Sequence, residues 1–82
     1  MIEILIVEDE KPISDLIRLN LMKAGYSCTC AFDGMEAADI LEERNFDLII
    51  LDVMLPKLNG FELMEYINPL GIPVIFLTAK AT

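Results

Sequence analysis

At 82 residues, 55% of them apolar, the chain is long enough for one domain and too hydrophobic to be disordered. Its 14 acidic and 6 basic residues give a net charge of −8, and the few Lys and Arg are scattered, which argues against direct nucleic-acid binding. No apolar run approaches the ~18 residues of a membrane span. We therefore expect a cytoplasmic protein without membrane contact.

Strand-like and helix-like segments alternate along the chain, which is typical of βαβ units around a parallel sheet. An apolar strand over residues 2–7 precedes a helix from Pro12 to Ala24, and Gly25 ends that helix. Helical spacing predicts that one face of this helix packs on the sheet. That face consists of Ile13, Leu16, Ile17, Leu21 and Ala24.

The second predicted strand, over residues 27–31, contains Cys28 and Cys30, whose side chains should face the same side of the sheet. They are most simply small apolar fillers in a reduced protein. A metal or redox pair would call for His, further Cys or C-x-x-C spacing, and the chain has none of these.

A helix over residues 34–44 follows, and the spacing of Asp33 and Glu36 predicts a capping box at its start. Turn residues separate the last three elements: Pro56, Asn59 and Gly60 precede the second of them, and Pro69 and Gly71 precede the third. The three elements are a strand over 47–51, a helix over 61–67 and a strand over 74–77.

Polar side chains follow three of the predicted strands: Glu8 and Asp9, then Asp52, then Thr78. Singly, each is typical of a helix cap or a strand-ending turn. Together they should meet at one sheet edge, where open α/β sheets bind ligands. Such oxygen ligands suit Mg²⁺, and a carboxylate beside the ion can attack phosphorus. This pattern predicts phosphoryl transfer to Asp52, with Thr78 donating to the phosphoryl group and Ala79 leaving room for it.

Three segments in register resemble the N-terminal two-thirds of a response-regulator receiver domain, the phospho-acceptor of two-component signalling. They are residues 4–10 (ILIVEDE), 47–56 (DLIILDVMLP) and 73–79 (PVIFLTA). The residues of the first and third segments are most similar to those of regulators with a winged-helix DNA-binding output domain.

The resemblance implies a role for several residues. Asp52 would be the phospho-acceptor and Thr78 the switch hydroxyl, while Glu8, Asp9, Asp52 and the backbone carbonyl of Met54 would bind Mg²⁺. The donor would be a sensor histidine kinase. The chain would not be a turnover enzyme, and would control transcription through an output domain absent here.

The resemblance also implies a flavodoxin-like (CheY-like) three-layer α/β sandwich, truncated after the fourth parallel strand, with strand order 2-1-3-4. Residues 1–82 would be a C-terminally incomplete receiver domain, without the family's fifth strand and the Lys that follows it. We expect this to expose the fourth strand and the side chains of Leu19 and Met22. The exposed edge and face predict self-association, as a dimer or by exchange of elements.

Three alternatives follow from the same residues. A phosphohydrolase with an aspartyl-phosphate intermediate would need a general acid two residues after Asp52, where Met54 stands. A nucleotide-binding module would need glycines in the first strand-to-helix turn, and residues 8–12 contain none. An inactive fragment that binds Mg²⁺ without productive phosphorylation remains open.

Overall fold

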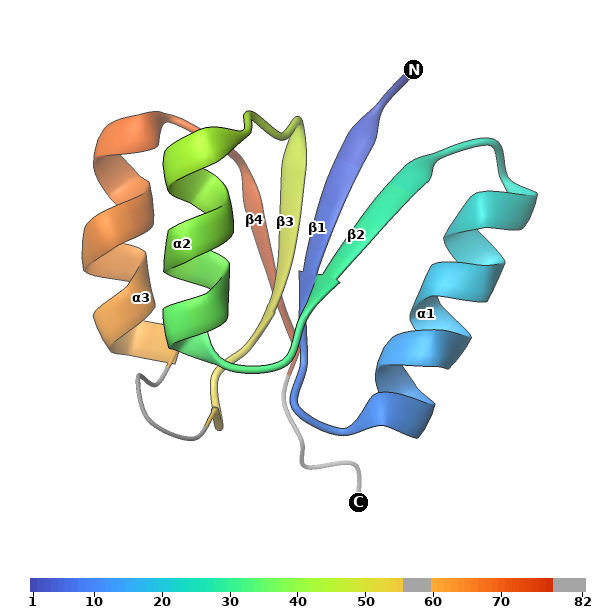
Figure 1. The fold of residues 1–82 in the computed structure, drawn as a ribbon, viewed down its shortest axis with the longest axis horizontal. Coiled ribbons are helices and arrows are strands. Elements are labelled where there is room, and N and C mark those ends of the chain that lie inside the picture. Colours follow the sequence, from blue (N-terminus) through green and yellow to red (C-terminus); the bar gives the residue numbers. More distant parts are fainter. Residues whose placement is uncertain (56–59, 78–82) are drawn as a thin grey trace.

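The computed structural model describes residues 1–55 and 60–77. Its elements are β1 (Glu3–Val7), α1 (Lys11–Lys23), β2 (Ser27–Ala31), α2 (Gly34–Glu43), β3 (Leu48–Asp52), α3 (Gly60–Ile67), the 3₁₀ helix η1 (Asn68–Leu70) and β4 (Val74–Leu77). The four parallel strands form one sheet in the order β2-β1-β3-β4, with α1 on one face and α2 and α3 on the other (Figure 1). This is the predicted CheY-like sandwich.

The two central strands, β1 and β3, have four buried residues out of five each. Their uninterrupted apolar runs suit strands that are covered on both faces. Alternate side chains pack on opposite sides of the sheet. Leu5, Val7, Ile49 and Leu51 pack with residues of α2 and α3, whereas Ile4, Ile6 and Ile50 face α1.

Helix α1 packs on the sheet by a narrower stripe than the sequence predicts. Ile17 and Leu21 pack against the Ile4, Ile6 and Ile50 cluster, as expected. The prediction was wrong for the other three residues of the predicted face, which are exposed to solvent. These are Ile13 (42% exposed), Leu16 (61% exposed) and Ala24.

Ser14 takes the place of those apolar residues in the buried stripe, since Ser14, Ile17 and Leu21 follow at helical spacing. Its side chain is fully buried, and its hydroxyl has no hydrogen-bond partner among the described residues. A buried unpaired hydroxyl destabilises the folded state by roughly 1–3 kcal/mol. The sequence offered no sign of this burial.

We expect Ser14→Ala to raise the free energy of unfolding by about 1 kcal/mol, because Ala removes the unpaired group and leaves almost the same volume. Urea unfolding monitored by circular dichroism measures this change. Lower stability in the variant would mean that the hydroxyl forms a favourable hydrogen bond, for example to a buried water.

The predicted capping box at the start of α2 is confirmed with one difference. The Glu36 N–H donates to Asp33 Oδ1 at 2.8 Å, and Glu36 Oε1 accepts from the Phe32 N–H, also at 2.8 Å. The Glu36 carboxylate thus accepts a hydrogen bond from the backbone of Phe32, the residue before the N-cap, and not from the N-cap residue Asp33 itself. Both bonds hold the connection between β2 and α2 in a defined conformation.

Strand β3 begins one residue later than predicted and includes Asp52. Asp47 instead exchanges two hydrogen bonds with Glu3: its N–H donates to the Glu3 carbonyl, and its Oδ2 accepts from the Glu3 N–H, both at 2.8 Å. The other predicted helices and strands agree with the structure to within one residue.

Cys28 and Cys30 are free, half-buried thiols that pack against the cluster facing α1. Burial, with the neighbouring Cys30, raises the pKa of the Cys28 thiol. A thiol of raised pKa is a poor nucleophile and metal ligand, which favours the filler interpretation. Among the residues that the structure describes, no helix is long and apolar enough to cross a membrane.

Candidate metal centre

The register of the two central strands places three carboxylates together. Val7 pairs with Leu51 across the sheet, so the next residues of each strand, Glu8 and Asp52, occupy neighbouring positions at the carboxyl edge. The Glu8 N–H donates to the Ala31 carbonyl at 3.1 Å, which extends the ladder between β1 and β2 by one residue. Glu8 is therefore held by the sheet rather than by a loop.

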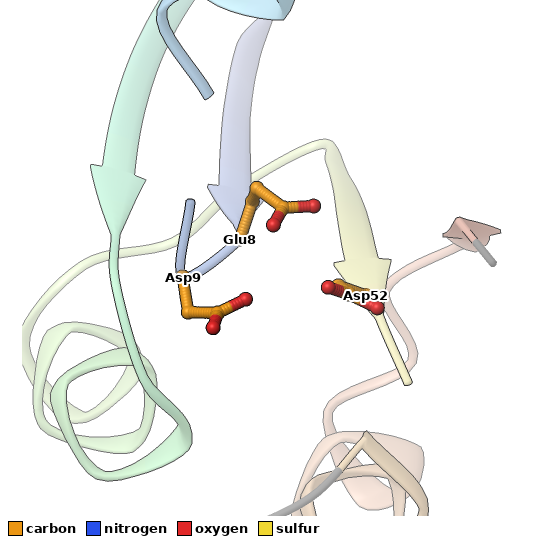
Figure 2. A group of neighbouring side chains, drawn as sticks. All are labelled: Glu8, Asp9 and Asp52. Atoms are coloured by element: carbon orange, nitrogen blue, oxygen red, sulfur yellow. The ribbon is translucent and has the colours of Figure 1, made fainter. Parts of the chain in front are cut away.

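Figure 2 shows the carboxylates of Glu8, Asp9 and Asp52 around one shared space. A ligand oxygen from each lies within 4.8 Å of the others. Glu8 and Asp52 are 4% and 3% exposed, whereas Asp9 is open to solvent. Carboxylate oxygens suit hard divalent cations, and the exposed Asp9 leaves a route of entry. The cluster can hold a metal ion.

Two local hydrogen bonds orient the buried carboxylates. The Met54 N–H donates to Asp52 Oδ1 at 2.9 Å, and the Glu10 N–H donates to Glu8 Oε2 at 3.1 Å. Each bond links a carboxylate to the backbone two residues further along and so favours this orientation of the side chain. The side chain of Met54 is itself 68% exposed and does not fill the site.

The charge of the cluster is unfavourable without a cation. The pKa of the Glu8 carboxyl is raised from 4.5 to about 7, first by burial and then by the neighbouring Asp52 and Asp9 carboxylates; the bond from the Glu10 N–H opposes this rise. A bound cation would remove the repulsion and favour ionised Glu8. The donor set therefore fits a hard divalent ion.

The structure brings together three of the predicted site residues, Glu8, Asp9 and Asp52, and places the backbone of Met54 against Asp52. The predicted switch hydroxyl, Thr78, and its neighbour Ala79 lie outside the described residues. Sequence reasoning took Gly60 as a turn residue of the resembling segment and gave it no role in the site. In the structure the Gly60 N–H donates to the Val53 carbonyl at 3.2 Å, directly behind the site.

Strand order reverses between β1 and β3, and the acidic cluster lies at that switch point, where open α/β sheets bind their ligands. Fold and site together define a CheY-like α/β protein with a carboxylate cluster able to hold a cation. The chain belongs to the response regulator receiver domain family, whose model matches residues 4–82.

Solved structures agree with this assignment. The receiver domain of Francisella response regulator 1452 is 33% identical, with a TM-score of 0.89, and the match covers 100% of this chain and 69% of that one. Response regulator TrrA from Thermotoga maritima, in complex with Mg²⁺-BeF, is 35% identical, with a TM-score of 0.92 and coverages of 99% and 72%. Chemotaxis protein CheY4 from Vibrio cholerae is 31% identical, with a TM-score of 0.91 and coverages of 100% and 72%.

Proposed function

We propose that this receiver domain accepts a phosphoryl group on Asp52 from a phosphohistidine of a sensor histidine kinase. The observation that carries the proposal is the position of the Asp52 carboxylate. It is buried at the switch point, held by the Met54 N–H and flanked by two further carboxylates. In the transfer, an Asp52 oxygen forms a bond to phosphorus as the phosphorus–nitrogen bond of the donor breaks.

We propose that Mg²⁺ is the metal, held by Glu8, Asp9, Asp52 and the backbone carbonyl of Met54. The ion would supply positive charge that offsets the repulsion between a carboxylate and an incoming phosphoryl group. The Mg²⁺-BeF complex of the Thermotoga maritima relative supports this choice of metal. The protein's own contribution is to hold three oxygen ligands at the strand ends before the donor arrives.

Thr78 would act as the switch hydroxyl, moving toward the phosphoryl group beside Ala79 and shifting the domain toward an active state. The output would be transcription control through a winged-helix domain of a longer protein. We place this activity in the cytoplasm, without nucleic-acid or membrane contact by the receiver itself, as its charge of −8 suggests. We regard the receiver as a phospho-acceptor that assists its own modification rather than a turnover enzyme.

Incubation of the chain with a small acyl phosphate tests the proposal. We expect the intact mass to increase by one phosphoryl group only when Mg²⁺ is present, and fragmentation to locate the group on Asp52. Phosphorylation at another residue, or to the same extent with a chelator, would contradict the proposed site. No gain in a folded chain with bound Mg²⁺ would favour the inactive alternative.

We also propose that the chain self-associates through apolar side chains that the described structure leaves open. On the edge strand β4, Ile75 and Phe76 are 52% and 42% exposed. On α1, Leu19 and Met22 are 52% and 50% exposed, as expected from the sequence. An apolar edge strand without a charge or a bulge is a template for pairing with another chain.

Light scattering over a concentration series measures this association. We expect the mean mass to rise above that of one chain and Ile75→Lys to reduce it, because a Lys on an edge strand opposes pairing. Met35→Lys, which replaces a 54% exposed apolar side chain on α2, outside the proposed surface, is the matched control. A single-chain mass at all concentrations would contradict the proposal.

A further inference from the structure

Gly60, the first residue of α3, lies unusually close to the backbone that carries Asp52. A Cβ atom at this position would lie 2.6 Å from Val53 Cα and 3.0 Å from the Asp52 carbonyl oxygen. These are main-chain atoms, which cannot turn aside as a flexible side chain can. Gly60 is also buried, and its N–H donates to the Val53 carbonyl at 3.2 Å. Any side chain at this position would push α3 and the end of β3 apart.

The backbone after Asp52 is held from several sides. The Val53 N–H donates to the Leu77 carbonyl of β4 at 3.4 Å, and its carbonyl accepts from Gly60 of α3. The Met54 N–H donates back to Asp52 Oδ1 at 2.9 Å. A shift of Val53 would therefore rotate both the Asp52 carboxylate and the peptide that follows it.

We propose that Gly60 is a positioning residue for the metal centre. Because it has no side chain, the start of α3 rests on the backbone of Asp52 and Val53, and this contact directs the Asp52 carboxylate toward Glu8 and Asp9. It also sets the direction of the Met54 carbonyl. The inference rests on the proposed function insofar as these groups bind Mg²⁺.

The variant Gly60→Ala tests the proposal, with Mg²⁺ affinity measured by calorimetric titration of the folded chain. We expect the affinity to fall about 10-fold or more, as happens when groups that orient metal ligands are altered. The matched control is Ile67→Ala, at the other end of the same helix, where a fully buried side chain is truncated. It should lower stability while leaving the Mg²⁺ affinity of the folded chain unchanged.

Wild-type affinity in Gly60→Ala would overturn the positioning role, and so would an equal loss of affinity in both variants. A second measurement needs no variant and stays informative if Gly60→Ala does not fold. Mg²⁺ should slow hydrogen exchange of the Gly60 N–H more than that of the Gly71 N–H, which donates to the Asn68 carbonyl at the same 3.2 Å. Equal slowing of both amides would also overturn the role.

These outcomes are separate from those that decide the proposed function. The proposed function fails if the wild-type chain binds Mg²⁺ and gains no phosphoryl group. The positioning role of Gly60 is tested by measurements of Mg²⁺ affinity and amide hydrogen exchange, and neither measurement needs a phosphoryl donor.

Discussion

Asp52→Asn is expected to abolish phosphoryl incorporation while leaving the domain folded. The Asn side chain has nearly the same volume and still offers an oxygen to the Met54 N–H, which Asp52 Oδ1 accepts at 2.9 Å. It has no carboxylate oxygen to attack phosphorus, and it removes one charge from the proposed Mg²⁺ site. Because Asp52 is only 3% exposed beside Glu8 and Asp9, losing that charge should also relieve repulsion and raise stability without metal.

Intact mass measured after incubation with Mg²⁺ and an acyl phosphate checks this result, and chemical unfolding checks the stability. Asp39→Asn is the matched control, since Asp39 is an exposed residue of α2 and the net charge changes equally. The control should be phosphorylated like the wild-type chain. Incorporation by Asp52→Asn at the wild-type level would show that another residue is the acceptor.

Glu8→Gln is expected to remove most of a pH dependence of stability that the metal-free wild-type chain shows between pH 4.5 and about 7. Below pH 4.5 the Glu8 carboxyl is protonated in both the folded and the unfolded state. Between these values the unfolded state loses the proton while the folded state keeps it, so stability falls as pH rises. Above about pH 7 the loss is complete.

A rise in pKa from 4.5 to about 7 corresponds to about 3 kcal/mol between the ends of this range. Glu8→Gln should therefore be the more stable chain above pH 7 in the absence of metal. Urea unfolding across the range, with a chelator present, measures the difference. Glu65→Gln on the exposed side of α3 is the control and should keep the wild-type slope. Identical slopes in wild type and Glu8→Gln would contradict the raised pKa.

Mg²⁺ should narrow the difference in stability between these two chains. Metal binding requires ionised Glu8, so the affinity of the wild-type chain should increase as pH rises through about 7. Saturating Mg²⁺ should then restore much of the stability lost at high pH. Glu8→Gln has lost one ligand and should gain little. Equal stabilisation of both chains by Mg²⁺ would exclude Glu8 as a ligand.

The packing of α1 shows where periodicity alone was insufficient. The pattern of apolar residues could not separate the stripe through Ser14, Ile17 and Leu21 from the neighbouring one through Ile13 and Leu16. The spacing of residues along the sequence determines which side chains share a face of the helix. Which face is buried depends on the rotation of the helix about its axis, and this is set by the sheet against which it packs. A serine consequently replaces two larger apolar residues in the buried layer.

Local sequence signals were sufficient to predict the helices and strands and the order in which they occur along the chain. The apolar runs of β1 and β3, each ending at a carboxylate, are properties of short segments, as is the capping pair Asp33 and Glu36. Such segments determine their own secondary structure because propensity, burial and capping agree within them. Alternation of strands and helices then restricts the topology to few arrangements.

Contacts between segments distant in sequence were decided only by the tertiary structure. The pairing of Val7 with Leu51 places Glu8 beside Asp52, and this proximity, together with burial, raises the pKa of Glu8. The close approach of Gly60 to Val53 likewise exists only once α3 has packed behind β3. The sequence by itself determined the strands, the helices and the acidic residues at the strand ends. Their separations and ionisation depend on packing and desolvation, which arise only in the folded chain.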